Sequence, residues 1–290
     1  MKEITLDANA KINLYLDVVS KRSDGYHNIE SVMQTLSLSD KVSVRWNECI
    51  NKKSIKQTFI NSDLPCDETN LCYKAAKAYF NCFDIDSYDI EISVEKNIPE
   101  AAGLAGGSAD AAAVIRALDI LCKKNSADTV LSEIGLMVGS DVAFCIVGGT
   151  CKVCGRGEIV EKLSPIPKLW AVVSKSQNES VSTKEAYAKI DSREINSDEK
   201  ISFNDYIDAL SRGDIKALTE NVYNVFQNVM ADSLCDTYEI INSMKKDGAL
   251  CSLMSGSGPS VFGLFDNEEL AKNACGNLKN KYYAELCMPV

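Results

Sequence analysis

The sequence predicts an α+β protein built from two domains. Segments that alternate polar and apolar residues, as strands do, are interspersed with segments that place apolar residues at helical spacing, a mixture typical of two-layer α+β domains. The chain has 290 residues, of which 46% are hydrophobic, enough for one large core or two ordinary ones. A close pair of prolines in Ser164-Pro-Ile-Pro167 marks a change along the chain. We place the domain boundary there, giving domains at residues 1–163 and 164–290.

In the first half, two patterns define the expected elements. Alternation predicts strands at Ile4–Leu6, Lys11–Val19, Leu36–Arg45, Lys56–Ile60 and Asp89–Val94. Helical spacing predicts helices at Thr69–Phe83, Ser108–Lys123 and Ser126–Val138, with Thr69 or Asn70 as the N-cap of the first. The pair Gly148-Gly149 predicts a turn into a further strand at Thr150–Val153.

The second half repeats the same mixture after a buried strand at Leu169–Ser174. Helices are expected at Ser182–Ile190, Phe203–Ser211, Ile215–Val222, Asp236–Lys246 and Glu268–Leu278. Strands are expected at Leu250–Met254, Ser260–Leu264 and Tyr282–Met288.

Composition limits the classes of partner. The net charge of −10 disfavours non-specific binding to nucleic acid or to an anionic membrane, because both need a basic face. The first residues alternate rather than form the apolar core of a signal peptide, and no apolar run approaches a membrane span. The 12 cysteines lack the dense pattern of a secreted scaffold, which indicates free thiols in a reducing cytoplasm. We therefore expect a cytoplasmic protein, in which local donors rather than a basic surface would hold any anionic ligand.

The most informative stretch is IPEAAGLAGGSADAAA, which runs from Ile98 to Ala113. A proline closes a strand, three glycines follow among small residues, and an alanine run then begins a helix. A helix start offers unpaired amides and the positive end of the helix dipole, and glycine lets an anion approach the backbone closely. The stretch therefore predicts a phosphate-binding loop. The glycine spacing is neither that of the common phosphate loop nor that of the dinucleotide fingerprint. The alternative is a small-residue turn that packs a helix tightly on a sheet.

Two further clusters could contact a ligand through side chains. Lys11 and Asn13 stand two apart in ANAKIN, hence on one face of a strand, although an edge-strand lysine in solvent has the same pattern. Tyr26 and His27 follow the turn dipeptide Asp24-Gly25, and a ring beside an imidazole suits a flat heterocycle. A surface hairpin with local packing is the alternative reading of that turn.

Two more clusters fit phosphate chemistry. Asp141 in GSDV places a carboxylate beside small residues, where it could accept a proton from an alcohol, hold a metal or cap the next turn. Ser255-Gly-Ser-Gly-Pro259 is a second glycine loop, and its amides could form an anion nest or a mobile turn.

Taken together, the motifs AKINLYLDV, DGYHNIESVMQTLSL, IPEAAGLAGGSADAAA, GSDVAFCIVGGT and LMSGSGPSVFGLF give the chain a family likeness. It resembles the GHMP small-molecule kinases, which include galactokinase and the homoserine, mevalonate and phosphomevalonate kinases. The resemblance implies an N-terminal domain like the second domain of ribosomal protein S5, a ferredoxin-like C-terminal domain, and ATP with Mg²⁺ as cofactors. The AKINL and DGYH segments are similar to those of members that phosphorylate a cytidine-diphosphate-linked methylerythritol.

The resemblance also implies roles for individual residues. Lys11 and Asp141 would flank the substrate hydroxyl, Asp141 as the proton acceptor. Asn13 would orient the substrate polyol, and Tyr26 and His27 would hold the cytosine, with Tyr187 a candidate for the opposite face of that ring. The residues expected around the ATP phosphates are Pro99, Glu100, Ala101, Ala102, Gly103, Leu104, Ala105, Gly106, Gly107, Ser108, Ala109 and Gly256, with Ser108 near the metal ion.

The chain departs from the family pattern at three positions. Ala105 and Ala109 stand where relatives often have a glycine and a serine, and Ala143 stands where many have proline. Three alternatives stay open: a GHMP kinase for another alcohol such as mevalonate or homoserine, a catalytically silent nucleotide-binding relative, and an RNA-binding protein. The DGYH turn argues against the first, the presence of Lys11 and Asp141 against the second, and the acidic charge against the third.

Overall fold

The computed structural model describes residues 2–47, 51–192 and 202–290. The chain folds into two compact units that interleave along the sequence. The first comprises the described residues of Met1–Ala10, Ser39–Glu100 and Ala105–Gly148, and the second those of Lys11–Leu38, Ala101–Leu104 and Gly149–Val290. The domain boundary between residues 163 and 164 stays a prediction. Each unit combines several separate segments of the chain, so the two units do not test a boundary at a single position.

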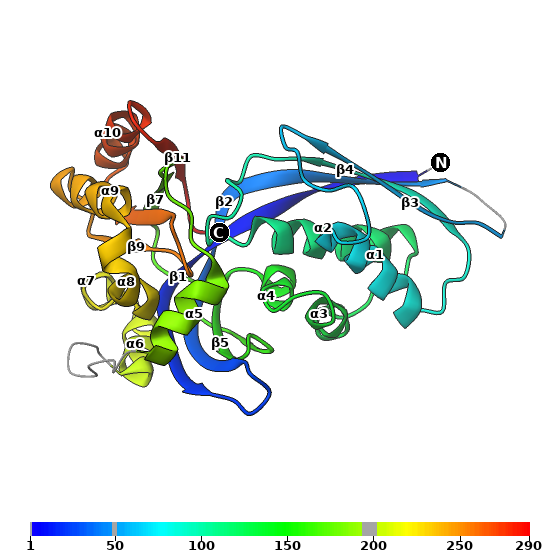
Figure 1. Ribbon diagram of the computed structural model, residues 1–290, viewed down its shortest axis with the longest axis horizontal. Helices are drawn as coiled ribbons and strands as arrows, with labels where there is room; N and C mark the ends of the chain where they lie inside the picture. Colours follow the sequence, from blue (N-terminus) through cyan, green and yellow to red (C-terminus); the bar gives the residue numbers. More distant parts are fainter. Residues whose placement is uncertain (1, 48–50, 193–201) are drawn as a thin grey trace. The chain divides into compact units, whose positions relative to one another are not determined.

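The first unit is a sheet covered by helices (Figure 1). Its strands are β3 (Lys53–Ile60), β4 (Tyr88–Glu95) and the parts of β1 (Lys2–Lys21) and β2 (His27–Asn47) that belong to this unit. β4 pairs antiparallel with β2 and parallel with β3. Its helices are α1 (Leu71–Cys82), α2 (Gly106–Leu121), α3 (Asp128–Leu136) and α4 (Val142–Val147). The alanine run of α2 is buried against α1, α3 and α4, so the small side chains let these helices pack closely.

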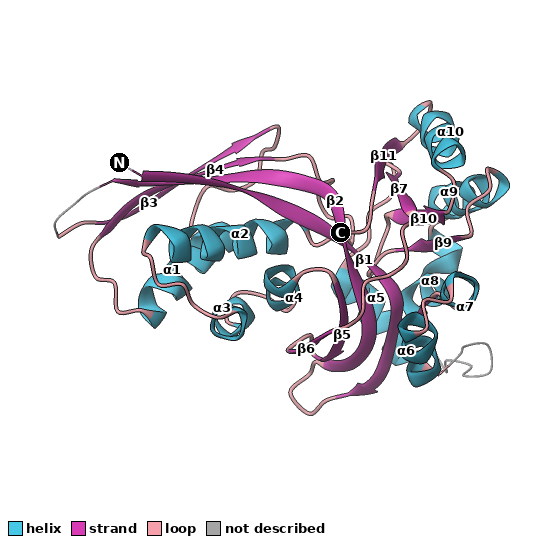
Figure 2. Cartoon of the chain, turned by 180° about the vertical axis from the view of Figure 1, so that it is seen from behind, coloured by secondary structure: helices cyan, strands magenta, loops and turns pink. Residues whose placement is uncertain are grey.

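The second unit contains a four-stranded antiparallel sheet in the order β11-β7-β10-β9. Its strands are β7 (Trp170–Lys175), β9 (Cys251–Met254), β10 (Val261–Phe265) and β11 (Tyr283–Cys287). Helices α9 (Cys235–Lys246) and α10 (Glu268–Lys279) pack on it, as Figure 2 shows. The succession β7, α9, β9, β10, α10, β11 is the ferredoxin-like arrangement, which the family resemblance predicted.

The rest of the second unit surrounds its own parts of β1 and β2. β5 (Thr150–Gly155) pairs with β2 and with β6 (Ile159–Lys162), and β8 (Tyr223–Asn224) pairs with β1. The helices are α5 (Thr183–Ser192), α6 (Phe203–Ser211), α7 (Ile215–Glu220), α8 (Val225–Met230) and the 3-10 helix η2 (Ala231–Ser233). A core that includes Leu16, Ile29 and Phe226 joins α5 and α8 to β1 and β2.

Most expected helices and strands are present. The structure differs from the expectation where two expected strands form one long strand and where short elements were not expected. The strands expected at Ile4–Leu6 and Lys11–Val19 are one continuous strand, β1. The short elements β6, β8, α4 and α8 were not expected, because two to six residues carry too little periodicity to be recognised. No helix among residues 2–47, 51–192 and 202–290 combines the length and apolarity needed to cross a membrane.

Candidate active site

The glycine-rich loop begins after β4 and ends where α2 starts at Gly106. The N-cap of α2 is Ala105, whose φ of 57° lies in the left-handed region, and its side chain makes no cap hydrogen bond. Ala109 N donates to Ala105 O at 2.9 Å, so the amides of residues 106–108 precede the first intrahelical bond. The helix start therefore offers amide donors that no N-cap side chain occupies, as an anion site requires.

The middle of this loop docks on the second glycine loop, within the second unit. A Cβ added at Gly103 would lie 2.2 Å from Ser255 O, so only glycine fits there. Ser255 Oγ donates to Gly103 O at 3.1 Å, and Ser260 N donates to Ala102 O at 3.3 Å. The loop expected to bind phosphate is thus held to the second glycine loop through its backbone carbonyls, which accept from the Ser255 hydroxyl and the Ser260 amide.

Lys11 lies at the same junction. Its amide donates to Leu104 O at 3.0 Å, and its Nζ lies 3.3 Å from where a Cβ of Gly256 would stand. A Cβ at Gly256, whose φ is +58°, would also lie 3.0 Å from Gly103 O. Three segments that are far apart in the sequence, at Lys11, Gly103 and Gly256, therefore lie side by side.

Buried hydrogen bonds hold the Lys11 side chain, which is 4% exposed. Lys11 Nζ donates to Asn13 Oδ1 at 2.7 Å, and Asn13 Nδ2 donates to Ser31 Oγ at 2.9 Å. Ser31 Oγ in turn donates to Tyr15 O at 2.7 Å. Lys11 and Asn13 do share one face of β1, and the solvent-exposed edge lysine is not what the structure shows.

Asn224 is a structural contributor that the sequence reasoning missed. Its Nδ2 donates to Met254 O at 2.7 Å and to Gly256 O at 2.8 Å, while its Oδ1 accepts from Phe226 N at 2.9 Å. The side chain therefore caps α8 and fixes the backbone that enters the second glycine loop. An asparagine before an apolar run was the available signal, but α8 is too short for its pattern to be read.

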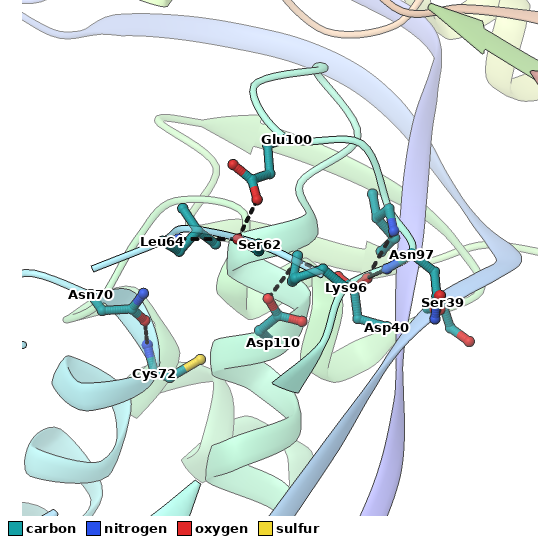
Figure 3. A network of polar contacts seen from close by, with 11 residues as sticks. Ser39, Asp40, Ser62, Leu64, Asn70, Cys72, Lys96, Asn97, Glu100 and Asp110 are labelled. Atoms are coloured by element: carbon teal, nitrogen blue, oxygen red, sulfur yellow. Dashed lines mark hydrogen bonds and ion pairs between the residues drawn. The ribbon is translucent and has the colours of Figure 1, made fainter. Parts of the chain in front are cut away.

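A buried ion cluster supports the base of the loop in the first unit (Figure 3). Lys96 Nζ is bonded to Asp40 Oδ2 and, at 2.7 Å, to Asp110 Oδ2. Asp40 Oδ1 accepts from the amides of Asn97 at 2.5 Å and Ile98 at 2.8 Å, which fixes the chain as it leaves β4. Lys96 and Asp40 were not predicted, because nothing in their local sequence pairs them.

Two carboxylates share one ammonium in this cluster, and their protonation reflects it. Burial raises the pKa of Asp110 to about 7, the Asp40 charge adds to that effect, and the Lys96 charge opposes it. Burial alone would lower the pKa of Lys96, but the carboxylates of Asp110 and Asp40 raise it above its usual value. Asp110 Oδ1 is buried without a hydrogen-bond partner among the described residues. The cluster keeps Lys96 charged beneath the helix start.

Asp141 belongs to the first unit and occupies the N-cap position of α4, but its side chain makes no cap hydrogen bond. It is half-buried. The capping alternative for its carboxylate is therefore not what the structure shows. Lys11 belongs to the second unit, and its pairing with Asp141 stays a prediction.

The Tyr26–His27 turn is held by polar side chains of the second unit. Asp24 accepts from Tyr26 N at 3.1 Å and from Arg22 Nε. The Tyr26 ring is 56% exposed, and the guanidinium carbon of Arg156 lies 5.0 Å from its centroid. Hydrogen bonds therefore hold the turn in place while the aromatic ring of Tyr26 is exposed to solvent.

His27 and Tyr187 stack on each other, with ring centroids 4.7 Å apart and an interplanar angle of 25°. Tyr187 also makes an edge contact with Phe226 at 4.9 Å. His27 Nε2 lies 2.8 Å from Asp191 Oδ1. The structure stacks Tyr187 on His27, and its place against the opposite face of the cytosine stays a prediction. The contact of His27 with Asp191 was not predicted from the sequence.

The nucleotide and the metal ion can be tested against these residues. The uncapped first turn of α2 suits phosphate, and a Cβ at Gly107 would meet only Leu71 Cδ1, at 3.6 Å, so that face of the turn is open. No group of three or more His, Cys, Asp or Glu among the described residues could hold a metal by itself. Mg²⁺ commonly takes few protein ligands beside phosphate oxygens and water, so the half-buried Ser108 fits an ion carried by the nucleotide.

Comparison with known proteins identifies the family of this chain. The family model "GHMP kinases N terminal domain" matches residues 70–149, and "GHMP kinases C terminal" matches residues 206–284. The chain belongs to the GHMP kinase family, and it is an ATP-dependent phosphotransferase that acts on an alcohol group.

Several relatives align with almost the whole length of this chain. The 4-diphosphocytidyl-2-C-methyl-D-erythritol kinase of Clostridioides difficile is 42% identical over 97% of this chain and 93% of its own. The enzyme of that name from Clostridium tetani is 40% identical over 96% of both chains. The crystal structure of a 4-(cytidine 5′-diphospho)-2C-methyl-D-erythritol kinase aligns with a TM-score of 0.81 at 29% identity, covering 99% of this chain and 100% of that one. The two-domain GHMP kinase fold predicted from the sequence is confirmed.

Proposed function

We propose that this protein transfers the γ-phosphoryl group of ATP to the 2-hydroxyl of 4-diphosphocytidyl-2-C-methyl-D-erythritol, a step in the non-mevalonate route to isoprenoid precursors. The junction of Lys11 with the loops at Gly103 and Gly256 is the observation that carries the chemistry. The name carried by relatives about 40% identical over nearly the whole chain supports the substrate.

The phosphate side of the reaction rests mainly on backbone. The segment Pro99–Ala109 surrounds the ATP phosphates, the first turn of α2 donates amides to them, and Gly256 lines the same region. Ser108 would help to hold Mg²⁺ through its hydroxyl, and the ion would neutralise phosphate charge. The acidic protein thus holds an anionic nucleotide with local donors rather than with a basic surface.

The acceptor side rests on side chains. Asp141 accepts the proton that the substrate hydroxyl loses, and Lys11 donates a hydrogen bond to the same oxygen and stabilises the charge that develops on it. Asn13 anchors Lys11 Nζ and orients the polyol. Tyr26 stacks on the cytosine, with His27 beside it and Tyr187 as the candidate for the opposite face.

The test of the acceptor chemistry is Asp141→Asn. We expect kcat to fall at least about a hundredfold, as for loss of a general base, while ATP affinity stays unchanged. Asp128→Asn is the matched control, because Asp128 lies in the same unit and only pairs with Arg116 at the surface. Near-normal turnover by Asp141→Asn would remove Asp141 from the role of base.

The test of the substrate is ATP consumption with the cytidine-diphosphate-linked substrate, mevalonate and homoserine side by side. We expect turnover with the first alone, because neither of the others has a base for the Tyr26–His27 turn. Turnover with mevalonate or homoserine alone would replace the proposed substrate, and turnover with none of them would favour a silent relative.

A further inference from the structure

The His27 imidazole is held by Tyr187 and by Asp191, and Asp191 has no role in the proposed function. Asp191, near the end of α5, places Oδ1 2.8 Å from His27 Nε2. Its Oδ2 is 2.5 Å from Lys21 Nζ, so both carboxylate oxygens are engaged. Tyr187, one turn earlier on the same helix, stacks on the ring face. One helix therefore fixes both the plane of the imidazole and one of its nitrogens.

The charge of Asp191 decides which proton the imidazole carries. Hydrogen bonds from Lys21 and then from His27 lower the pKa of this carboxyl group, so it is ionised and can only accept. Nε2 must then be the donor, since an unprotonated Nε2 would face a carboxylate oxygen with two lone pairs opposed. In the neutral ring this leaves Nδ1 as the acceptor.

An acceptor at Nδ1 has a consequence for base recognition. At position 4 of the pyrimidine, cytosine carries an amino group, which donates, and uracil carries a carbonyl oxygen, which only accepts. A nitrogen lone pair directed at that position accepts a hydrogen bond from the amino group of cytosine and is repelled by the carbonyl oxygen of uracil. Sites that hydrogen-bond one group reject an analogue that cannot make the bond, because a polar atom is then left unpaired.

We propose that Asp191 is a positioning residue for base selection: it acts through His27 to present Nδ1 as an acceptor for the 4-amino group of cytosine, and so selects cytosine over uracil. This inference rests on the proposed function for the location of the base. It assigns Asp191 no contact with the substrate.

The first test reads the imidazole directly. The chain contains one histidine, so long-range ¹H–¹⁵N correlation spectra of the labelled protein report His27 without ambiguity. In the neutral ring we expect the Nε2–H tautomer in the wild type and a mixture of tautomers in Asp191→Asn, because an amide can either accept or donate. An Nδ1–H tautomer in the wild type would overturn the proposal.

The second test measures selection. We expect cytidine 5′-monophosphate to bind at least about tenfold more tightly than uridine 5′-monophosphate, and this ratio to fall to within about threefold in Asp191→Asn and Asp191→Ala. In turnover, both variants should raise KM for the cytidine-diphosphate-linked substrate and leave kcat near normal, since the base lies away from the reacting hydroxyl. An unchanged ratio in both variants would overturn the proposal.

Lys21→Met is the matched control. It removes the other partner of Asp191 and leaves the Oδ1–Nε2 contact in place, so tautomer and base ratio should stay as in the wild type. The two proposals fail separately. Absence of turnover with an intact cytidine preference rejects the kinase substrate alone, whereas turnover with an Nδ1–H tautomer rejects the role of Asp191 alone.

Discussion

Two regions of the second unit that we propose to bind ligand are built in different ways. Where the loop at Gly103 meets the loop at Gly256, the two backbones approach so closely that a Cβ at Gly103 would lie 2.2 Å from Ser255 O. The Tyr26–His27 turn is made by side chains that bond to one another, with Asp191 supplied from α5. A backbone site depends on where residues have no side chain, whereas a side-chain site depends on which side chains are present.

This difference predicts how each region responds to substitution. At the glycine loops a single added carbon must displace backbone, so substitution should cost folding and activity together. At the turn, Tyr26 is largely exposed, so its substitution should have little effect on the fold and should change substrate affinity alone. Stability and kinetics measured on the same variants separate the two.

Gly103→Val should have the largest effect. Its Cβ would overlap Ser255 O, and a β-branched residue is strained at the φ of +74°. We expect activity to fall by at least about a thousandfold and Tm to fall by several degrees, in line with a loss of about 2–4 kcal/mol. Activity assays and calorimetry on one preparation give both values.

Gly107→Ala is the control within the same loop. Its Cβ would meet only Leu71 Cδ1 at 3.6 Å, in ordinary van der Waals contact, and the position is helical. Tm should therefore hold or rise slightly, because alanine favours helix over glycine. If Gly103→Val were as stable and active as the wild type, the loops would not be joined by this contact.

How far the sequence alone predicts this arrangement follows from the same contrast. The order strand, glycine loop, helix was predictable because the three segments are consecutive, and the observed β4 and α2 lie within two residues of the expected ends. Phosphate binding by this loop stays a prediction. The position of Lys11 beside Gly256 was not predictable, since no local pattern relates residues 245 positions apart. The family resemblance assigned Lys11 and Gly256 to the same active site but did not give the distance between them.

Supporting residues were the least predictable. Asp40 and Lys96 form a buried pair across 56 positions, and each alone looks like an ordinary charged residue, Asp40 on β2 and Lys96 just after β4. Asp191 and Asn224 likewise gain meaning only from partners elsewhere in the fold. Sequence patterns report periodicity and local turns, whereas such pairs are set by tertiary packing.

Tyr26→Ala tests the side-chain region with a smaller effect. A stacked base contributes about 1–3 kcal/mol, so KM for the cytidine-diphosphate-linked substrate should rise about 5- to 150-fold. kcat, KM for ATP and Tm should stay near the wild-type values, because the ring is 56% exposed and packs mainly beneath Arg156.

Tyr26→Phe is the companion variant for this position. It keeps the ring and removes the hydroxyl, so its KM should remain within about threefold of the wild type if stacking is what binds the base. A Tyr26→Ala enzyme with unchanged KM would show that the exposed ring does not stack on substrate, and the contrast between the two regions would lose its side-chain half.

Ala105→Gly should have the smallest effect and tests the backbone region from the opposite direction. Ala105 is a left-handed N-cap at φ 57°, where a Cβ costs about 1 kcal/mol that glycine avoids. We expect the free energy of unfolding to rise by up to about 1 kcal/mol, with kcat within twofold. Ala127→Gly is the matched control, since Ala127 is also an N-cap without a side-chain bond, but at φ −66°. The general preference of N-caps for glycine over alanine and the added freedom of the unfolded chain apply to both variants, so their difference isolates the left-handed backbone. Equal shifts in urea unfolding would mean that Ala105 carries no strain, and that the loop tolerates a methyl group there as readily as glycine.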